Sequence, residues 1–394
     1  MKRLLLAGGG QAHVFVLRAL ARERPANVEV ILVTPSDQLI YTGMLPGWIA
    51  GHYRLPELTI PLAPLLQAAN TRLVLARIAA VDVARRTAHT DRGEAIDFDL
   101  LSIATGPTPN FGAIAGAHEY ALPLRPLDAF VAGWQRIHAH ALAAHEPSAR
   151  PPEGGLAPAW RDGAQRQGCT NTPLQLTIIG AGAGGIEIAL AAKHRLPAVH
   201  VRLVTGDTAI LPGHNVHARS LAHAALRRYG VQLVAAVAER VESHTIVLDS
   251  GESLASDHTL LMTGAAAEPW LRQTGLATDD DGFVAINEYL QSRSHDFVFA
   301  AGDAATMMHS VRPKSGVYAV RAGAPLAVNL LAALSGTPLK PYRPQRRALY
   351  LLSTGARHAI ASWGSFAFEG DWVWRWKDRI DRGYIAKFSY PFGA

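Results

Sequence analysis

The sequence of 394 residues contains only one cysteine, Cys169. A single thiol cannot form an intramolecular disulfide, a CxxC redox pair, a cysteine-held iron–sulfur cluster or a thiolate zinc site. We therefore expect that any electron transfer by this protein proceeds without a dithiol, and we predict no metal site.

Long apolar runs and long basic runs are also missing. No stretch approaches the roughly 18 apolar residues that a membrane-spanning helix needs. The apolar start, Met1 to Ala7, ends at three glycines and is too short for a signal peptide, so a cytoplasmic protein is expected. The net charge is +6, but the arginines are spread along the chain, and nucleic acid is therefore not an expected partner.

Glycine, in contrast, is concentrated near the start. The apolar run Lys2–Ala7 predicts a buried strand, the three glycines after it predict a tight turn, and Gln11–Arg24 has the apolar period of a helix. The amides at such a helix start suit a diphosphate, with Gly8 allowing the sharp turn and Gly10 allowing close approach. His13 replaces the third glycine of the GxGxxG pattern, so a plain turn between strand and helix remains the alternative.

Asn27–Thr34 (NVEVILVT) predicts the second strand of the same unit. Such a strand usually ends in an acidic residue that binds a ribose hydroxyl, but here it ends in Thr34. Either hydroxyl groups hold the ribose or this part of the pattern fails. The next segment, Ile40–Tyr53, is an apolar loop with glycine and proline, which either packs against a flat ring system or covers the core.

The opening pattern returns in the middle of the chain. A strand leads into the turn GAGAGG, which completes GxGxxG through Gly180, Gly182 and Gly185, and a helix follows. Asp257–Gly264 (DHTLLMTG) also echoes Asp99–Gly106 (DLLSIATG). Such an internal duplication predicts two nucleotide-binding domains.

The second copy lacks a carboxylate directly at the end of its second strand, where Thr205, Gly206 and Asp207 stand. It therefore does not indicate a choice between NADH and NADPH. Further on, the strand DFVFAAGD ends in Gly302 and Asp303. Asp303 is placed to accept hydrogen bonds from a polyhydroxyl chain, to cap a helix, or to do both.

Taken together, these pieces resemble the pyridine nucleotide-disulfide oxidoreductase superfamily, whose members are flavoproteins with two dinucleotide-binding domains. The resemblance covers Leu4 to about Leu334 and depends on both glycine turns, on the ATG and MTG that close the repeats, and on the segment ending in Asp303. The nearest members are cysteine-free FAD oxidoreductases similar to type II NADH dehydrogenases, of the kind fused to selenide, water dikinase. The segments YTGMLPGWIAGHY and RPKSGVYAVRAG of this chain are similar to segments of these proteins.

The resemblance implies an α/β fold with two Rossmann-like three-layer domains, the second inserted in the first, and a small α+β C-terminal region. Residues 1–110 and 268–335 would form the FAD-binding domain, 111–267 the NAD(P)H-binding domain, and 336–394 the C-terminal region. The second domain would carry an exposed insertion at about 147–173, rich in proline and glycine and including Cys169.

The cofactors implied by the resemblance are FAD and NAD(P)H. FAD would place its diphosphate at Gly8 and Gly10, its adenine near Ile78 and its ribityl chain at Asp303. The positions expected to bind FAD are Gly8, Gly10, Gln11, Thr34, Ile78, Ala104, Thr105, Gly106, Gly302 and Asp303, and those expected to bind NAD(P)H are Gly180, Gly182 and Gly185.

The activity implied is transfer of hydride from NAD(P)H to the flavin and of electrons onward to a small acceptor such as a quinone, without a redox disulfide. Two other functions stay open. One is an FAD oxidase or oxygenase with an unidentified substrate, which the kinase fusion would link to selenium. The other is a flavin-holding interaction protein with little turnover.

Lys314 is the candidate catalytic residue. It stands just before an apolar helix, Val317–Leu334, where the helix dipole disfavours a cation, so an anionic flavin or substrate would account for it. The alternative is an ordinary solvated lysine in a loop.

The C-terminal part predicts two or three strands followed by a helix. Trp372, Trp376, Ile380 and Tyr384 are four residues apart and form one stripe, with arginines and a lysine around it. Such a stripe is typical of an interfacial helix, so residues 371–388 are candidates for peripheral contact with the inner face of the membrane. Alternatively, the tryptophans pack on the flavin domain or on a second copy of the chain in a homodimer.

Overall fold

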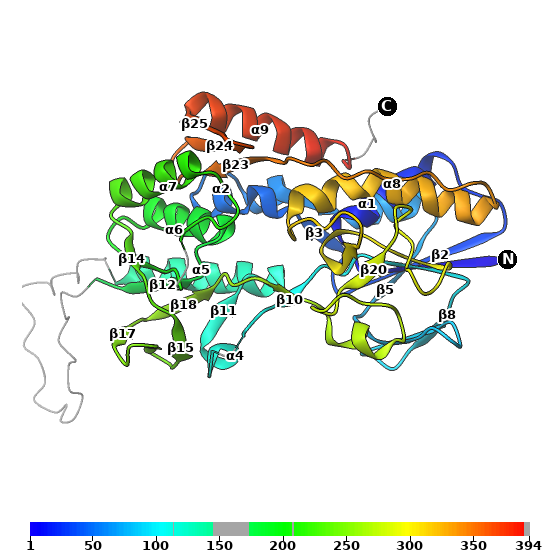
Figure 1. The fold of residues 1–394 in the computed structure, drawn as a ribbon, viewed down its shortest axis with the longest axis horizontal. Coiled ribbons are helices and arrows are strands. Elements are labelled where there is room, and N and C mark those ends of the chain that lie inside the picture. Colours follow the sequence, from blue (N-terminus) through cyan, green and yellow to red (C-terminus); the bar gives the residue numbers. More distant parts are fainter. Residues whose placement is uncertain (113, 145–172, 207–208, 390–394) are drawn as a thin grey trace, which may run out of the picture.

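The computed structural model describes residues 1–112, 114–144, 173–206 and 209–389. Over these residues the chain forms two lobes side by side, each built around a parallel sheet, with a small third part lying across both (Figure 1). The insertion expected at about 147–173 and its Cys169 lie outside the described residues, apart from Pro173.

The first lobe contains a five-stranded parallel sheet. Its strand order is β21-β9-β1-β2-β5, and Leu5 of β1 is opposite Ile31 on one side and Leu101 on the other. The strands are β1 (Lys2–Ala7), β2 (Val28–Thr34), β5 (Arg72–Leu75), β9 (Leu100–Ile103) and β21 (Val298–Ala300). Most of β1 is buried on both faces of the sheet, which explains why the strand is a continuous apolar run.

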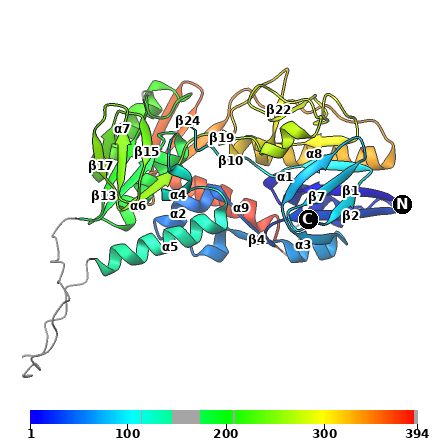
Figure 2. The same cartoon turned by 90° about the horizontal axis from the view of Figure 1, so that it is seen from below.

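Helices and an antiparallel meander complete this lobe as outer layers. The helices α1 (Gln11–Arg22) and α8 (Gly316–Ser335) pack against each other above the sheet, and α3 (Leu62–Ala68) lies beside α1. The meander covers the other face, and Figure 2, viewed from below, shows it in front of the sheet. Its strands are β6 (Ile78–Asp82), β7 (Thr87–Thr90) and β8 (Ala95–Asp97).

The second lobe repeats this plan, with the strand order β11-β18-β12-β13-β14 in its parallel sheet. Its strands are β11 (Ala121–Pro123), β12 (Gln175–Ile179), β13 (His200–Val204), β14 (Gln232–Val234) and β18 (His258–Leu261). Its helices are α5 (Leu127–Ala143), α6 (Ala183–Arg195) and α7 (Val216–Tyr229), and its meander is β15 (Ala238–Val241), β16 (Thr245–Leu248) and β17 (Ser253–Ala255). Because β21 of the first sheet follows this whole lobe in the sequence, the second lobe is inserted in the first. The predicted fold class is confirmed.

The C-terminal part is a three-stranded antiparallel sheet followed by a helix, as predicted. It consists of β23 (Leu349–Ser353), β24 (Ala359–Trp363), β25 (Phe366–Gly370) and α9 (Asp371–Ala386), and it lies over both lobes at the top of Figure 1. Trp374 of α9 packs into the core of the second lobe, whereas Tyr384 and Phe388 pack into the core of the first. The C-terminal part therefore ties the two lobes together.

The segment 40–53 differs from the predicted loop. It contains a 3₁₀ turn at Thr42–Met44 and the helix α2 (Leu45–Ile49), so the prediction of an irregular loop is wrong. Pro46 stands in the first turn of α2, where a helix needs no backbone donor. The ends of α2 are buried in the core of the second lobe, and this burial organises a stretch whose glycines and prolines favour a loop.

Among the described residues, α8 alone is long and apolar enough to cross a membrane. This corrects the expectation that no apolar run approaches that length. The helix is packed against α1, and its fully buried Asn329 donates hydrogen bonds to the carbonyl oxygens of Tyr289 and Lys340. These contacts are those of a core helix in a globular domain.

Candidate functional site

The first glycine turn lies at the carboxyl end of β1, against the turn that follows β9. Gly8 has a φ of +94°, and a Cβ on it would come within 2.5 Å of the Thr105 Cα atom. A Cβ on Gly10 would lie 2.2 Å from the Ala104 carbonyl oxygen. Both glycines are therefore required by the contact between the two turns, a requirement that the sequence pattern alone does not reveal.

The ends of neighbouring strands bring two further predicted FAD positions to the same edge. Thr34, at the end of β2, is buried, and its Oγ1 atom lies 2.8 Å from the place of a Cβ on Gly9. The Thr34 carbonyl accepts a hydrogen bond from the Ala76 amide. The start of β6, with the buried Ile78, therefore lies near this edge.

Asp303 lies in a 3₁₀ turn directly after β21, with Gly302 packed on α8. Gly302 has a φ of +70°, and a Cβ on it would lie 3.3 Å from the Cβ of Ala319. Burial raises the pKa of the Asp303 carboxyl, while the cations of Arg125 and Lys314 lower it. The structure thus brings Gly302 and Asp303 to the same sheet edge as the first glycine turn.

Arg125 belongs to this site, although no sequence motif points to it. It follows β11 of the second lobe, yet its Nη1 atom lies 3.6 Å from the place of a Cβ on Gly106, in the first lobe. Burial lowers the pKa of the Arg125 guanidinium, and the Asp303 carboxylate opposes this shift. A positive charge therefore enters the site through a contact between the lobes.

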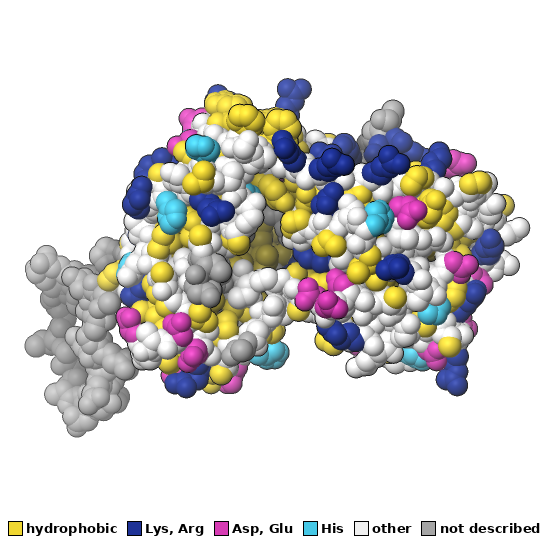
Figure 3. All heavy atoms as spheres, viewed as in Figure 1, with side chains coloured by type: hydrophobic (Ala, Val, Ile, Leu, Met, Phe, Trp, Pro, Cys, Tyr) yellow, Lys and Arg dark blue, Asp and Glu magenta, His cyan; other side chains and the backbone are white. Residues whose placement is uncertain are grey.

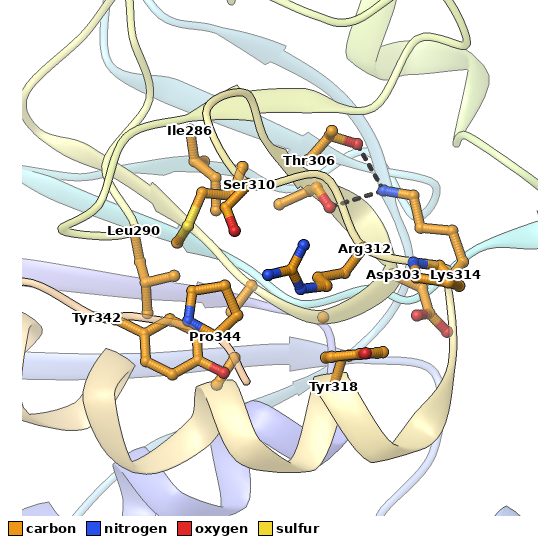
Figure 4. Close-up of a pocket in the computed structure, with 16 residues that line it drawn as sticks. Ile286, Leu290, Asp303, Thr306, Ser310, Arg312, Lys314, Tyr318, Tyr342 and Pro344 are labelled. Carbon is orange, nitrogen blue, oxygen red and sulfur yellow. Dashed lines mark hydrogen bonds between the residues drawn. The ribbon is translucent and has the colours of Figure 1, made fainter. Parts of the chain in front are cut away.

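Lys314 lies on the wall of a pocket that is open to solvent (Figure 4). Its Nζ atom donates hydrogen bonds to the Ala305 carbonyl (2.6 Å) and the Thr306 hydroxyl (2.7 Å) of β22, and lies 3.8 Å from the centre of the Phe283 ring. Burial lowers the pKa of Lys314 to about 8. Lys314 is thus not the solvated loop lysine of the alternative interpretation. The strand β22 spans Ala305–Met307, and the pocket is also lined by Asp303, Arg312, Tyr318 and Tyr342.

The helix α8 begins beside Lys314 without a side-chain cap. Ser315 is its N-cap residue, but the Ser315 hydroxyl makes no capping bond and is buried without a hydrogen-bond partner. The Tyr318 and Ala319 amides of this 20-residue helix already donate to the Ser315 carbonyl. The Ser315 hydroxyl and the amides of Gly316 and Val317, which precede them, can bind polar atoms of a ligand. Such unsatisfied groups beside Asp303 fit a polar cofactor such as FAD.

The second glycine turn lies between β12 and α6 and uses its glycines differently. Gly180 has a φ of +113°, and a Cβ on it would lie 2.5 Å from the Met262 carbonyl oxygen. A Cβ on Gly185 would lie 1.8 Å from the Gly180 carbonyl oxygen. A Cβ on Gly182 would meet no atom within 4 Å, so the backbone there faces open space that a diphosphate can approach.

A buried polar network lies where α6, the segment 40–53 and α9 meet. The carboxyl of Glu187 on α6 accepts a hydrogen bond from the Ser353 amide. Burial raises the pKa of this carboxyl to about 7, against the opposing effects of the Lys377 cation and of that hydrogen bond. Lys377 of α9 donates hydrogen bonds to the Asp381 carboxylate (2.6 Å) and the Gly43 carbonyl (2.5 Å).

This network continues to the first glycine turn. The Tyr41 hydroxyl donates to the Asp381 carboxylate (3.1 Å), and the Tyr41 ring stacks on that of Tyr384, with 4.4 Å between centroids. The Tyr384 hydroxyl donates to the side-chain oxygen of Gln11, the first residue of α1. Gln11 and Tyr384 are among the residues predicted from the sequence. Glu187 is missed, although it has a signal in the sequence as an acid inside the apolar helix GIEIALAA.

The aromatic stripe predicted for α9 is confirmed only in part. Trp372, Trp376 and Ile380 are 51%, 38% and 45% exposed. Tyr384, the last residue of the predicted stripe, is buried because it stacks on Tyr41. Lys377, expected in the basic rim, is also buried, and the Asp381 carboxylate neutralises its charge there.

Comparison with known proteins places this geometry in a family. The profile of the family described as pyridine nucleotide-disulphide oxidoreductase matches residues 2–323. A demethylphylloquinone reductase of Synechocystis sp. is 24% identical over 374 residues, which cover 90% of this chain and 85% of that protein. An NADH dehydrogenase-like protein of Mycobacterium tuberculosis is 26% identical over 320 residues, which cover 77% of this chain and 73% of that protein.

Two solved structures have the same fold. That of NDH2 from Plasmodium falciparum in complex with NADH has a TM-score of 0.77 at 13% identity, covering 100% of this chain and 99% of that one. The sulfide:quinone oxidoreductase of Aquifex aeolicus has a TM-score of 0.76 at 16% identity, covering 98% of this chain and 91% of that one. Since the family match spans most of the chain, with both glycine turns and Asp303, this protein belongs to the pyridine nucleotide-disulphide oxidoreductase family.

Proposed function

We propose that this protein is an FAD-dependent oxidoreductase that takes hydride from NAD(P)H and passes electrons to a small acceptor such as a quinone, without a redox disulfide. The observation that carries the proposal is the pair of parallel sheets with the same plan, each with a glycine turn at its carboxyl edge. Family membership and the names of two similar proteins, a demethylphylloquinone reductase and a sulfide:quinone oxidoreductase, support it. The single cysteine supports an electron path without a dithiol.

The first lobe is the proposed FAD-binding domain, and FAD supplies two-electron chemistry when bound. We assign the diphosphate to Gly8, Gly10 and Gln11, and the adenosine to Thr34 and Ile78. The ribityl chain is assigned to Ala104, Thr105, Gly106, Gly302 and Asp303. The proposed domain limits are 1–110 with 268–335 for FAD, 111–267 for NAD(P)H and 336–394 for the C-terminal region.

The second lobe is the proposed site of NAD(P)H, with Gly180, Gly182 and Gly185 at its diphosphate. The open space at Gly182 supports this assignment. No atom lies within 4 Å of the place of a Cβ on Gly182, which leaves room for phosphate oxygens. The chain's role is then to bring the nicotinamide ring within hydride reach of the flavin ring.

Two charged side chains are proposed to assist. Lys314 is the candidate catalytic residue, because two hydrogen bonds hold its cation in place near Asp303. Glu187 is proposed to hold a proton, because reduction of a quinone consumes protons and a carboxyl with a pKa of about 7 carries one in many molecules at neutral pH.

The function is tested by anaerobic mixing of the FAD-loaded protein with NADH and, separately, with NADPH. Rapid bleaching of the flavin, followed by recovery on addition of a soluble quinone, is the expected result. An FAD oxidase or oxygenase would instead be bleached by a different substrate and recover with oxygen. If neither nicotinamide cofactor bleaches the flavin, the proposed reductase activity is wrong.

We also propose that the protein works in the cytoplasm and touches the inner face of the membrane through residues 371–388. The rings of Phe368, Trp372 and Trp376 stack in one exposed row, with 5.2 Å and 6.5 Å between successive centroids. Figure 3 shows hydrophobic side chains together with lysine and arginine along the upper edge of the molecule, where α9 and β25 lie. Aromatic rings beside cations suit an anionic lipid surface. Contact with this surface would also bring the protein close to quinones dissolved in the bilayer interior.

Flotation with vesicles of anionic lipid tests this contact. The full chain is expected to float at low salt, and the double variant Trp372→Ser, Trp376→Ser is expected to remain at the bottom. Val216→Ser, at a 69% exposed position on α7, is the matched control and should float. If the unmodified chain does not float and sedimentation reports a dimer, the stripe covers a second copy of the chain instead.

A further inference from the structure

His13 occupies the place of the third fingerprint glycine in the first turn. The second turn has Gly185 there, and a Cβ on it would lie 1.8 Å from the Gly180 carbonyl oxygen. The first turn accommodates a whole imidazole at the equivalent place. Here the Nδ1 atom of His13 lies 2.5 Å from the carbonyl oxygen of Gly8, so a hydrogen bond replaces the close backbone approach.

The partners of His13 define its tautomer. The Gly8 carbonyl can only accept, so Nδ1 carries the proton and donates it. Nε2 is then an acceptor, and the Ser102 hydroxyl, 2.9 Å away, donates to it. Both His13 and Ser102 are 0% exposed, and burial lowers the pKa of His13 to about 4, so the imidazole is neutral at physiological pH.

Ser102 connects this hydrogen bond to the neighbouring strand of the site. It lies on β9 opposite Leu6 of β1, two residues before Ala104. The Ala104 carbonyl is the atom that requires a glycine at position 10. The glycine turn therefore lies between the His13 imidazole and Ala104. The imidazole links Gly8, after β1, to Ser102 of β9. The Ala104 carbonyl, after β9, packs against Gly10.

We infer that His13 is a positioning residue for a dinucleotide diphosphate: it stands in for the third glycine and holds the Gly8 carbonyl, so that the amides of the turn keep the direction that the diphosphate needs. The inference rests on the proposed binding of FAD at this turn. His13 acts through Gly8, and a turn that is already ordered before the ligand arrives lowers the entropic cost of binding.

The test compares two replacements of His13 that differ in their hydrogen-bonding groups. His13→Leu fills much of the space without a donor, whereas His13→Asn supplies a side-chain N–H close to the place of Nδ1. The dissociation constant of FAD is measured by fluorescence titration of the deflavinated protein. The melting temperature of the same FAD-free protein reports packing separately.

We expect His13→Leu to weaken FAD binding by about 10- to 100-fold and His13→Asn to restore most of the affinity. Ser102→Ala keeps the donor at Nδ1 and is expected to weaken FAD binding by less than about 10-fold. The Leu variant should still bind NAD(P)H as the unmodified protein does, because its second turn is unchanged.

Wild-type FAD affinity in His13→Leu would overturn the inference. An equal loss of affinity in the Leu and Asn variants would also overturn it, because packing alone produces that pattern. If His13→Leu does not fold, His13→Asn decides by itself, since an Asn variant that folds but has lost FAD contradicts a role for the Nδ1 donor. If the unmodified chain takes up no FAD, the proposed function is wrong, which is a separate result.

Discussion

The two glycine turns have the same place in their sheets but are held in different ways. A Cβ on Gly10 would lie 2.2 Å from the Ala104 carbonyl, whereas its counterpart Gly182 would meet no atom within 4 Å. The first turn is also held by the hydrogen bond from His13 to the Gly8 carbonyl. At its middle glycine the first turn is thus packed against the neighbouring strand. The second turn is open at that position only, since it is closely packed at Gly180 and Gly185. This difference is the one expected between a site for a resident cofactor and a site for a cofactor that must enter and leave.

The largest difference between the turns, in stability and in flavin content, is expected when the middle glycine of each is replaced by alanine. Gly10→Ala forces the Ala104 carbonyl to move, and we expect it to lower the free energy of unfolding by about 1–3 kcal/mol and to yield protein without FAD. Gly182→Ala adds its methyl to open space and should change the free energy of unfolding by less than about 0.5 kcal/mol, with FAD retained and a raised KM for NAD(P)H. Denaturant unfolding and the flavin content of each variant measure this. A similar loss of stability in both variants would remove the distinction between the turns.

Both turns can be predicted from the sequence because each is a short local pattern of strand, glycines and helix, repeated with its closing TG. The atoms that require each glycine cannot be predicted in the same way. The carbonyl opposite Gly10 belongs to Ala104, far along the chain, and the contact depends on the pairing of β1 with β9. Arg125 is missed for the same reason, since it enters the site from the other lobe.

The C-terminal part shows the same limit. The four-residue spacing predicts one aromatic stripe on α9, and its exposed half is where the pattern predicts. The pattern does not predict that Tyr384 turns inward onto Tyr41, because Tyr41 lies far away in the sequence. It also does not predict that the pair of Lys377 and Asp381, four residues apart on α9, is buried. The helix α2 is missed because its composition favours a loop and only tertiary packing stabilises it.

The next largest effect is expected from a substitution on the helix that follows the second turn. In this helix, α6, Glu187 has the position that Phe15 has in α1. The pKa of Glu187 is raised from 4.5 to about 7, so between these values the folded protein binds a proton that the unfolded chain has released. The protonated Glu187 carboxyl therefore contributes about 3 kcal/mol to the free energy of unfolding at low pH. This contribution is lost as the pH rises from about 4.5 through about 7.

Glu187→Gln should remove this pH dependence and should be more stable than the unmodified protein at about pH 8. Denaturant unfolding at several pH values measures it, with Glu239→Gln, on an exposed strand position, as the matched control. The variant should also slow reoxidation of the flavin by a quinone. If the free energies of unfolding of the Gln variant and the unmodified protein changed with pH in the same way, the raised pKa of Glu187 would be contradicted.

A smaller effect is expected at Lys314, on the side of the first turn. We expect Lys314→Ala to slow the reduction or the reoxidation of the flavin by about 10-fold, because a fixed cation near Asp303 is lost. In the unmodified protein the same rate should fall as the pH rises through about 8, where Lys314 loses its proton, and the variant should lack this step. Stopped-flow half-reactions measure both, and Lys340→Ala, at an exposed position of the chain, is the control. Unchanged half-reaction rates would exclude a role for Lys314 in flavin chemistry.

The smallest effect is expected where the second strand of each sheet ends in threonine. Thr34 is buried beside Gly9 of the first turn, whereas the Thr205 hydroxyl donates to the Gly206 carbonyl at 3.1 Å. Thr34→Val replaces the hydroxyl by a methyl group of similar size and should weaken FAD binding by about 3- to 10-fold. Thr205→Val should leave the KM for NADH and NADPH within about two-fold, because the backbone already uses this hydroxyl. A rise in KM for one nicotinamide cofactor alone would mean that Thr205 contacts its ribose, and the two turns would then be alike at this position.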